Sequence, residues 1–571
     1  MKTYLDFKPA QCKNCYKCLR ECPVKAISVV GHQARIIEDR CILCGTCASV
    51  CPQNAKHVHN DTDEVKKLLS SGAAVAASVA PSFVSSFKLK DFSVMKIALG
   101  KLGFTLAEET AIGANTVVGE YKKLLAEGSY KNFITSACPA INRMIQLYYP
   151  NALPYLAKVD TPMIAHAKLL KRSNPDVKVV FVGPCIAKKR EASESGLIDA
   201  VLTFEDLNDM FESSGINLKT IAELPQNGKG RTANRAKYFP IHRGIIKSFE
   251  ELPSGYEYIA VDGIKKCADV LENVETVSGL FLELSACDYS CVKGPCSLLN
   301  FATAIKGNSD IRNYVNKDLS LQKASLLKPA DDLPISARYN KLDCSGSAVP
   351  ERIIREILAK TGKFKPEDEL NCGACGYSTC REKAWAVANG FADVEMCLPY
   401  MRDRAETMSY EIIQNSPDGV IAVDFDLNII EMSKMAHVIL GIDDRNTKGK
   451  PLVDYFNPTD FMLAKEDEKR VSLRNVKIHK TNKTAELTVT VLKEQRVMFG
   501  IFKDITDKIN YDNRLSEVRM ETIATADEVI QKQMRVAQEI AGLLGETTAE
   551  TKVVLLKLKK ALSQPNDGDK K

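Results

Sequence analysis

Two copies of one cysteine pattern, C-x2-C-x2-C-x3-C followed by proline, stand in the first 60 residues of this chain. Three thiolates at this spacing hold one face of a [4Fe-4S] cubane, and the fourth, beside the proline, ligates the cluster of the other copy. The pattern predicts two [4Fe-4S] clusters, with a pair of zinc knuckles as the alternative. The predicted ligands are Cys12, Cys15, Cys18 and Cys51 for cluster 1, and Cys41, Cys44, Cys47 and Cys22 for cluster 2.

The composition indicates in which cellular compartment the protein works and which kinds of partner are not expected. Nineteen cysteines in a chain that opens without the apolar core of a secretory signal favour metal ligation in a reducing cytoplasm. The most apolar run, 73–80, is far shorter than the ~20 residues of a membrane helix, so no membrane partner is expected. The 78 basic and 72 acidic residues are mixed along the chain, which gives no reason to expect nucleic acid.

A second group of four cysteines lies far downstream, in NCGACGYSTC and the segment after it. Its glycines let the backbone pass close to a cluster, and a helix predicted over 381–390 returns the last cysteine to the first three. The segment resembles the small four-cysteine [4Fe-4S] domain of several anaerobic corrinoid and electron-transfer proteins. A structural zinc site is the alternative. The predicted ligands of this cluster 3 are Cys372, Cys375, Cys380 and Cys397.

Four further cysteines are scattered: Cys138 in TSACPAIN, Cys185 in VGPCIAKKRE, and Cys287 and Cys291 in LELSACDYSCVKG. Taken singly, each is explained as an ordinary buried cysteine. Apolar strands predicted at 178–182 and 280–284 precede two of these segments, however. Ligands of open α/β folds bind beyond the carboxyl ends of strands, so the four together suggest a site.

These segments resemble the three signature motifs of the iron–iron (FeFe) hydrogenases, in the same order, over about residues 1–300. The resemblance implies that Cys291 bridges a [4Fe-4S] cluster to a diiron subcluster bearing CO, cyanide and a dithiolate, together the H-cluster. It implies that Lys188 hydrogen-bonds a cyanide, that Pro81 and Ser82 form the turn beside the diiron site, and that Glu191 is the retained acid of the second motif. The implied cluster ligands are Cys138, Cys185, Cys287 and Cys291.

The departures from this family concern proton transfer. Ala137 stands where the family has its proton-transferring cysteine, and Ala157 where it has a serine. The two relay glutamates of the family fall near Glu120 and Lys123. Loss of general acid–base assistance slows a reaction by about 10²–10⁴-fold, so slow turnover is expected.

The expected pocket is also unusually polar, which shifts cluster potential and proton affinity. Cys296 takes a position that is glycine in the family, and it has no assigned role, like Cys267 and Cys344. The other departing positions are Gly183, Ser285, Asp288, Tyr289 and Ser290.

The C-terminal third resembles a PAS domain. SPDGVIAVDFDLNIIEMSKMAHVILG mixes strand and short-helix patterns, 486–492 and 496–502 are β-rich, and a D-I-T sequence at 504–506 closes the segment. A generic α+β domain is the alternative. His437 is interpreted as structural, because no heme or flavin motif accompanies it.

After residue 507 the pattern becomes helical. Apolar residues at 523, 526, 530, 537, 540 and 544 follow the 3-4 spacing of a coiled-coil seam. This predicts a dimeric signalling helix, with a single packed helix as the alternative. No kinase glycine box or phosphatase metal aspartates follow, so an effector kinase or phosphatase is expected to be a separate protein.

The chain is therefore expected to be a multidomain α/β and α+β protein that acts as a slow, sensory FeFe hydrogenase. It would bind H2, exchange electrons with a carrier such as ferredoxin, and pass its redox state to a PAS and coiled-coil output in a homodimer. The alternatives are a catalytic ferredoxin-linked hydrogenase and an iron–sulfur scaffold that lacks the diiron subcluster. The expected domains are a dicluster ferredoxin domain (1–60), an H-cluster domain (61–345), a four-cysteine [4Fe-4S] domain (346–405), a PAS-like domain (406–510), a coiled-coil helix (511–562) and a polar tail (563–571).

Overall fold

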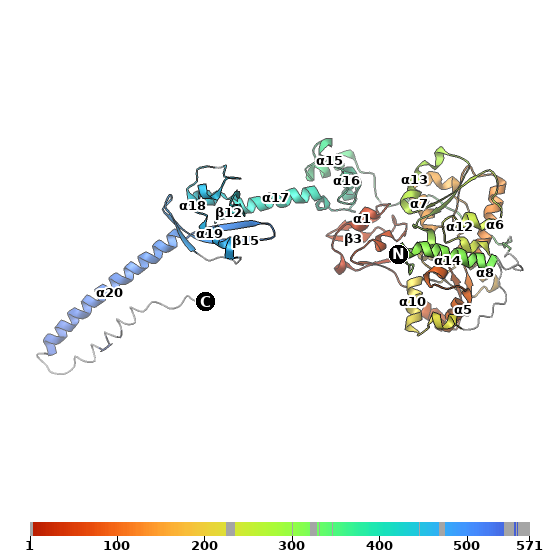
Figure 1. Cartoon of the computed structure of the whole chain (residues 1–571), viewed down its shortest axis with the longest axis horizontal. Coiled ribbons are helices and arrows are strands. Elements are labelled where there is room, and N and C mark those ends of the chain that lie inside the picture. Colours follow the sequence, from red (N-terminus) through yellow and green to blue (C-terminus); the bar gives the residue numbers. More distant parts are fainter. Residues whose placement is uncertain are drawn as a thin grey trace. The chain divides into compact units, whose positions relative to one another are not determined.

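The computed structural model describes residues 4–223, 234–299, 301–319, 328–330, 332–344, 346–444, 446–467, 474–541, 553–554 and 557. The chain forms two compact units, Met1–Tyr400 and Met401–Lys571 (Figure 1). The predicted tail at 563–571 and most of the predicted helix beyond residue 541 lie outside the described residues. Among the described residues, no helix combines the length and apolarity needed to cross a membrane.

The ferredoxin domain consists of two small antiparallel sheets and two short helices that follow the cysteine repeats. One sheet pairs β1 (Leu5–Phe7) with β4 (Lys56–Val58), and the other pairs β2 (Ile27–Val30) with β3 (Gln33–Ile36). Helices α1 (Lys17–Glu21) and α2 (Thr46–Ser49) each begin within a C-x2-C-x2-C-x3-C copy. The internal repeat of the sequence is thus matched by a repeat of local structure.

The hydrogenase-like domain contains two parallel sheets, which fits apolar strands buried on both faces. The first has the order β6-β5-β8-β9 and the second β10-β11-β7. The predicted strands at 178–182 and 280–284 are confirmed as β8 and β11. The strands are β5 (Val75–Val79), β6 (Leu106–Glu109), β7 (Phe133–Ile134), β8 (Lys178–Gly183), β9 (Ala200–Thr203), β10 (Glu257–Asp262) and β11 (Leu280–Ser285).

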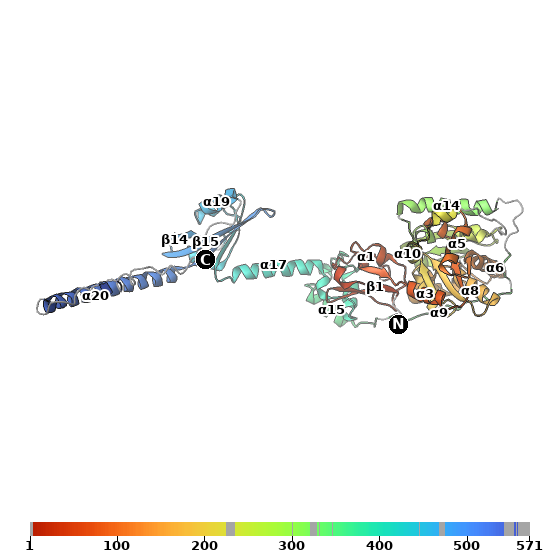
Figure 2. The same ribbon diagram turned by 90° about the horizontal axis from the view of Figure 1, so that it is seen from below.

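Helices cover these sheets, among them α5, α6, α8 and α14 (Figure 2). Helix α14 packs on α4 through the edge-to-face contact of Tyr314 with Phe83. The helices of the domain are α3 (Thr62–Ser70), α4 (Phe83–Ser86), α5 (Phe92–Leu102), α6 (Ala111–Glu127), α7 (Pro139–Tyr148), α8 (Pro162–Ser173), α9 (Ala187–Ser195), α10 (Phe204–Ser213), α11 (Leu218–Ala222), α12 (Gly244–Ser248), α13 (Ile264–Asn273) and α14 (Phe301–Leu319).

The four-cysteine domain packs directly on the ferredoxin domain. It contains α15 (Glu351–Lys360) and α16 (Cys380–Ala388), which is the helix predicted at 381–390. Lys25 donates to the Gly376 carbonyl (2.7 Å) and Arg20 to that of Ala374 (3.4 Å), so α1 lies against the cysteine loop. Helix α17 (Leu398–Gln414) begins at the residue after the last cysteine.

The second unit has the mixed α+β architecture expected of a PAS domain. Its antiparallel sheet has the order β13-β12-β16-β15-β14, and the two predicted β-rich runs pair as β15 and β16. Helix α20 (Thr506–Ala541) follows, and apolar side chains along it, among them Val529, Val536 and Ile540, are exposed. The other elements are β12 (Gly419–Asp424), β13 (Ile429–Met432), α18 (Lys434–Leu440), α19 (Thr459–Asp467), β14 (Arg474–Ile478), β15 (Lys483–Leu492) and β16 (Val497–Asp504).

Candidate functional site: a cysteine-lined cavity

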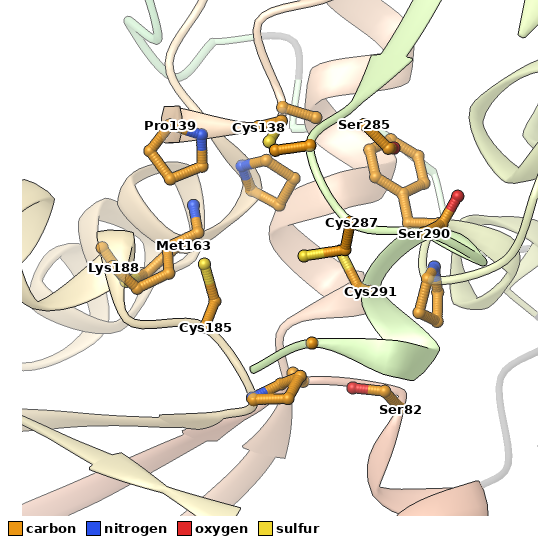
Figure 3. A pocket seen from close by; sticks show the side chains of 18 of the residues that line it. Ser82, Cys138, Pro139, Met163, Cys185, Lys188, Ser285, Cys287, Ser290 and Cys291 are labelled. Carbon is orange, nitrogen blue, oxygen red and sulfur yellow. The ribbon is translucent and has the colours of Figure 1, made fainter. Parts of the chain in front are cut away.

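A cavity of about 120 Å³ lies where strands of both parallel sheets end (Figure 3). This is several times the ~10–15 Å³ that one water molecule needs, so the cavity can hold a much larger group. Its walls include the segments that directly follow β5, β8 and β11, at 80–82, 184–185 and 286–287. Parallel strands thus deliver three separate parts of the sequence to one place.

The residues that the sequence assigned to the cluster ligands, the cyanide contact, the turn beside the diiron site and the replaced proton-transferring cysteine all line this one cavity. Cys138 is the N-cap of α7, whereas Cys291 lies in a short 3-10 helix, Ser290–Lys293. Cys291 lies deep inside the protein, and its exposed surface faces the cavity. The gathered residues are Pro81, Ser82, Ala137, Cys138, Cys185, Lys188, Cys287 and Cys291.

The donor set fits an iron–sulfur group. Burial raises the pKa of the Cys185 thiol to about 11 and also raises the pKa of Cys138 and Cys287, so a metal group must displace their protons. No three described His, Cys, Asp or Glu side chains lie close enough to hold a single metal ion. The four thiols instead surround open space, as the ligands of a larger group do.

Lys188 provides a fixed positive charge in the cavity wall. Its ammonium donates to Glu191 Oε2 (2.7 Å) and to Thr161 Oγ1 (2.9 Å). An ammonium has three N–H donors, so one remains for an anionic group in the cavity. Glu191, the retained acid of the second motif, therefore orients Lys188.

The Ser82 hydroxyl is a second group in the cavity that suits the binding of a polar ligand. Its side chain is fully buried, and its hydroxyl has no hydrogen-bond partner among the described residues. Figure 3 shows that this hydroxyl points toward the cavity. A buried hydroxyl without a partner is unfavourable, so this position suits a protein that binds a polar group there.

Apolar side chains pack behind Ala137, and the buried hydroxyls of Ser136 and Tyr121 beside it bond each other at 3.0 Å. Ala137 packs against the buried cluster that contains Val117 and Ala157. Glu120 and Lys123, where the relay glutamates were expected, pair with each other at 3.4 Å on the partly exposed side of α6. No acid therefore stands next to Ala137 at these positions.

Another side of the cavity is polar, as the sequence predicted at Ser290, but the sequence did not indicate its partners Asp262 and His242. The Ser290 hydroxyl donates to Asp262 Oδ1 (2.8 Å), and Asp262 Oδ2 lies 3.2 Å from Nδ1 of the half-exposed His242. Burial raises the pKa of Asp262. Tyr289 and Ser290 have φ of 61° and 55°, a region that costs a non-glycine residue about 1–2 kcal/mol. This row contains groups able to carry a proton from the cavity toward the half-exposed His242.

The ferredoxin domain reaches the cavity itself, through Leu43 and Cys44. Cys44 also interacts electrostatically with Cys287, which places a predicted cluster 2 ligand beside the cavity. The electrostatic neighbours of Cys47 are Cys41, Cys44 and Cys22, the other members of the predicted cluster 2 set. The spacing of the cysteines predicted this set of ligands but did not indicate that it lies beside the cavity.

Met163 of α8 also lines the cavity, and no sequence motif indicated it.

Gly45 allows this close approach. Its φ is +79°, and an added Cβ would lie 2.7 Å from Pro295 Cγ and 3.0 Å from Ile186 Cδ1. We expect Gly45→Ala to lower the stability of the first unit by at least the ~1–2 kcal/mol of a left-handed alanine. Gly72→Ala is the matched control, because Gly72 has φ +77° and open space around it. Urea midpoints followed by circular dichroism should fall further for Gly45→Ala; equal shifts would contradict the close approach.

The predicted cluster 3 residues also surround one pocket. It is lined by Cys372, Cys375, Cys380 and Cys397, together with the buried Lys363 and Lys383. Its four cysteines lie close in the sequence and could be grouped from spacing. The two lysines belong to no sequence motif, so the sequence did not indicate that they line this pocket.

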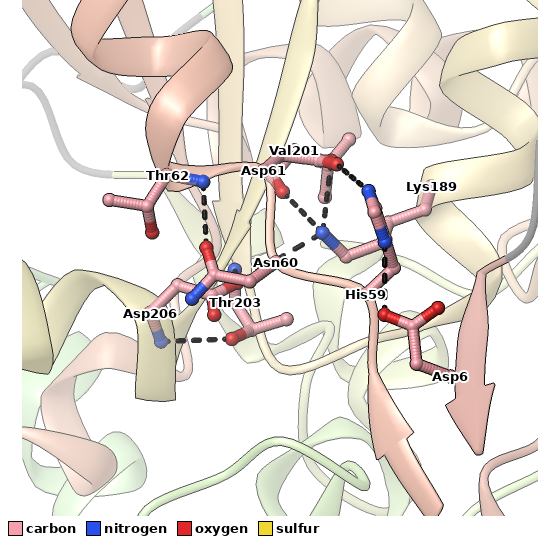
Figure 4. A network of polar contacts seen from close by, with 9 residues as sticks. All are labelled: Asp6, His59, Asn60, Asp61, Thr62, Lys189, Val201, Thr203 and Asp206. Carbon is pink, nitrogen blue, oxygen red and sulfur yellow. Dashed lines mark hydrogen bonds and ion pairs between the residues drawn. The ribbon is translucent and has the colours of Figure 1, made fainter. Parts of the chain in front are cut away.

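A buried ion network joins the ferredoxin domain to the hydrogenase-like domain (Figure 4). The Lys189 ammonium lies 2.9 Å from Asp61 Oδ2 and 4.0 Å from Asp206 Oδ2, and it donates to the Val201 carbonyl (2.8 Å). His59 lies 3.1 Å from Asp6 and 3.8 Å from Asp61. Lys189 follows Lys188 directly, so the network holds the helix that carries the cavity lysine.

The fold and the cavity define an iron–sulfur protein with a buried site for a large metal group. Residues 73–257 match the family described as iron only hydrogenase large subunit, C-terminal domain. Residues 5–63 match a 4Fe-4S dicluster domain, 368–399 a putative Fe-S cluster, and 407–505 the PAS fold.

Curated relatives include the periplasmic [Fe] hydrogenase large subunit of Nitratidesulfovibrio vulgaris, 28% identical over 318 residues, which are 43% of this chain and 75% of that protein. Iron hydrogenase 1 of Clostridium pasteurianum is 28% identical over 213 residues, 34% of each chain. A variant of the [FeFe]-hydrogenase HydA1 from Chlamydomonas reinhardtii superposes with a TM-score of 0.39 at 16% identity, over 50% of this chain and 100% of that one.

Proposed function

We propose that this chain is a sensory FeFe hydrogenase that binds H2 at an H-cluster and turns it over slowly. The observation that carries the proposal is one cavity that gathers Cys138, Cys185, Cys287, Cys291 and Lys188 while Ala137 faces it from an apolar wall. When bound, the diiron group would supply the interconversion of H2 with two protons and two electrons. The residues of the chain then determine how fast protons and electrons leave.

Two side chains would act on the group directly. The Lys188 ammonium would hold an anionic ligand, and the Ser82 hydroxyl would donate to a polar one. Ala137 has no proton to give, and general acid–base help is worth about 10²–10⁴-fold in rate. The site therefore binds H2 and reports it more than it consumes it.

The electrons would pass from the cavity through the ferredoxin clusters toward cluster 3. Cys44 stands in the cavity wall, the Gly376 loop packs on α1, and Cys397 precedes α17. At the far end of α17, the Gln414 amide donates to Glu431 Oε1 (2.9 Å) and to the Met432 carbonyl (3.1 Å) on β13 of the PAS domain. We propose that α20 dimerises through its exposed apolar residues and acts on a separate kinase or phosphatase, in the cytoplasm.

Infrared spectroscopy of the matured protein tests the H2 response. We expect CO and CN bands that shift between argon and H2, because H2 changes the redox state of a group held by the cavity cysteines. Cys291→Ser should lose the diiron bands while Cys296→Ser keeps them. Bands that ignore H2 would refute the sensory function.

One observation favours a catalytic hydrogenase as the second candidate. The Ser290–Asp262–His242 row reaches from the cavity toward solvent and could carry protons in place of the missing cysteine. Turnover on the order of hundreds per second with a viologen dye, at the upper part of the usual enzyme range, would support this candidate. Full iron loading of the [4Fe-4S] sites without any CO band would instead indicate an iron–sulfur scaffold.

A further inference from the structure

Two buried lysines stand against the cluster 3 cysteines. Lys363 is 9% exposed and Lys383 is 6% exposed, and both line the pocket that the four thiols surround. The Lys363 ammonium lies 3.4 Å from Cys397 Sγ. The two lysines come from different elements, since Lys363 follows α15 and Lys383 belongs to α16.

These ammonium groups face sulfur and not carboxylate. Lys363 also donates to the Thr361 carbonyl (3.1 Å), and Lys383 to the Val394 carbonyl (2.7 Å). Within the described part of the chain, neither lies within ion-pair distance of an acidic side chain. The negative groups that act on Lys383 are Cys397, Cys375 and Cys380. Because an isolated charge is very unfavourable in a protein interior, the buried counter-charge of this pair is the thiolate set, and the partly exposed Asp368 also acts on Lys363.

The ferredoxin domain differs in this respect. Among its described lysines, Lys56 is the one that is fully buried, where it interacts with Cys18, Cys47 and Cys51. Arg190 donates to the Cys41 carbonyl (2.6 Å), but Glu38 lies 3.5 Å from the same guanidinium and offsets its charge. The pocket of cluster 3 is thus lined by two buried lysines, whereas the described part of the ferredoxin domain has one.

We propose that Lys363 and Lys383 raise the reduction potential of cluster 3, so that electrons released at the H-cluster come to rest there. Reduction adds one electron to the 2+ core and gives the 1+ core, with no bond broken and no proton released. Net charge and hydrogen bonds to sulfur set the potentials of such clusters, and a nearby cation favours the more negative, reduced state. The electron source rests on the proposed hydrogenase function, whereas the effect of the lysines on the potential does not.

The position of cluster 3 suits a cluster with a raised reduction potential to a role in signalling. Cys397 is followed at once by Leu398, the first residue of α17, and α17 ends on β13 of the PAS domain. A charge that rests on cluster 3 is therefore one residue from the helix that enters the output unit. The two lysines would make this cluster the place where exposure to H2 is stored.

Redox titration of the full chain with dithionite, followed by electron paramagnetic resonance, tests the proposal. Cys372→Ser identifies the cluster 3 signal by its loss. We expect cluster 3 to accept the first electron in the wild type, and Lys363→Met or Lys383→Met to lower its reduction equilibrium constant at least tenfold, which is about 59 mV for one electron. Lys363→Arg should keep most of the potential. Lys360→Met, which removes an exposed lysine of α15, should leave the potential unchanged.

Unchanged cluster 3 midpoints in both methionine variants at full iron content would overturn the proposal, as would reduction of cluster 3 after clusters 1 and 2 in the wild type. If one variant loses iron, the other variant and the wild-type order still decide. Dithionite supplies the electrons in this experiment, so its result is independent of H2 binding. A failure here with intact infrared changes under H2 would leave the hydrogenase proposal standing.

Discussion

Lys189→Met is expected to lower the free energy of unfolding of the first unit by about 3–5 kcal/mol, the usual effect of removing one partner from a buried ion group. The Lys189 side chain is 2% exposed, and the two carboxylates beside it, Asp61 and Asp206, are 5% and 11% exposed. Burial already raises the pKa of Asp206, and Lys189 opposes that rise. Without the ammonium, two carboxylates stay buried next to each other, and one of them must take up a proton or draw in water.

Urea unfolding under anaerobic conditions, followed by far-UV circular dichroism, measures this effect. Lys265→Met is the matched control: Lys265 also bridges the ferredoxin and hydrogenase-like domains, at 2.9 Å from Glu21, but its side chain is 67% exposed. An exposed ion pair contributes about 0–1 kcal/mol, so this variant should unfold near the wild-type midpoint. Similar midpoints for both variants would show that the Lys189 network does not join the two domains.

The sequence was most informative where ligands lie close together along the chain. The two ferredoxin sets and the cluster 3 set could be grouped from spacing alone, because a loop that wraps a cubane needs its thiols a few residues apart. The β-rich runs at 486–492 and 496–502 likewise predicted strands β15 and β16 of the second unit. The family assignments of these regions and of the hydrogenase domain are confirmed.

The cavity could not be assembled in that way. Cys138, Cys185 and Cys287 belong to three different segments, and only the pairing of parallel strands brings them together. The resemblance to a family supplied what spacing could not. The sequence did not indicate Asp262 or Lys363, because only tertiary packing gives these residues their neighbours. For the same reason it did not indicate that Cys44 lines the cavity.

Restoring a cysteine at position 137 is expected to raise H2 turnover less than about tenfold. The new thiol would face the cavity, but it would pack against the apolar cluster that contains Val117 and Ala157, and the Ser136 and Tyr121 hydroxyls beside it already bond each other. A donor helps only when a hydrogen-bonded partner can reload it. Ala137→Cys combined with Ala157→Ser gives the thiol such a neighbour, and we expect about 10²-fold, the lower end of general acid–base catalysis.

Hydrogen evolution from a reduced viologen dye, in H2O and in D2O, compares these variants. Ala140→Cys adds a thiol elsewhere on the same cavity wall and should leave the rate unchanged. If Ala137→Cys alone gave the full 10²-fold gain, the apolar wall would not be the barrier, and water or the Ser290–Asp262–His242 row would have to reload the thiol. If the double variant stayed as slow as the wild type and showed no solvent isotope effect, proton delivery would not limit this site. Slow turnover would then have to arise at the metal group or in electron transfer, and the Ala137 position would be a consequence of the sensory role instead of its cause.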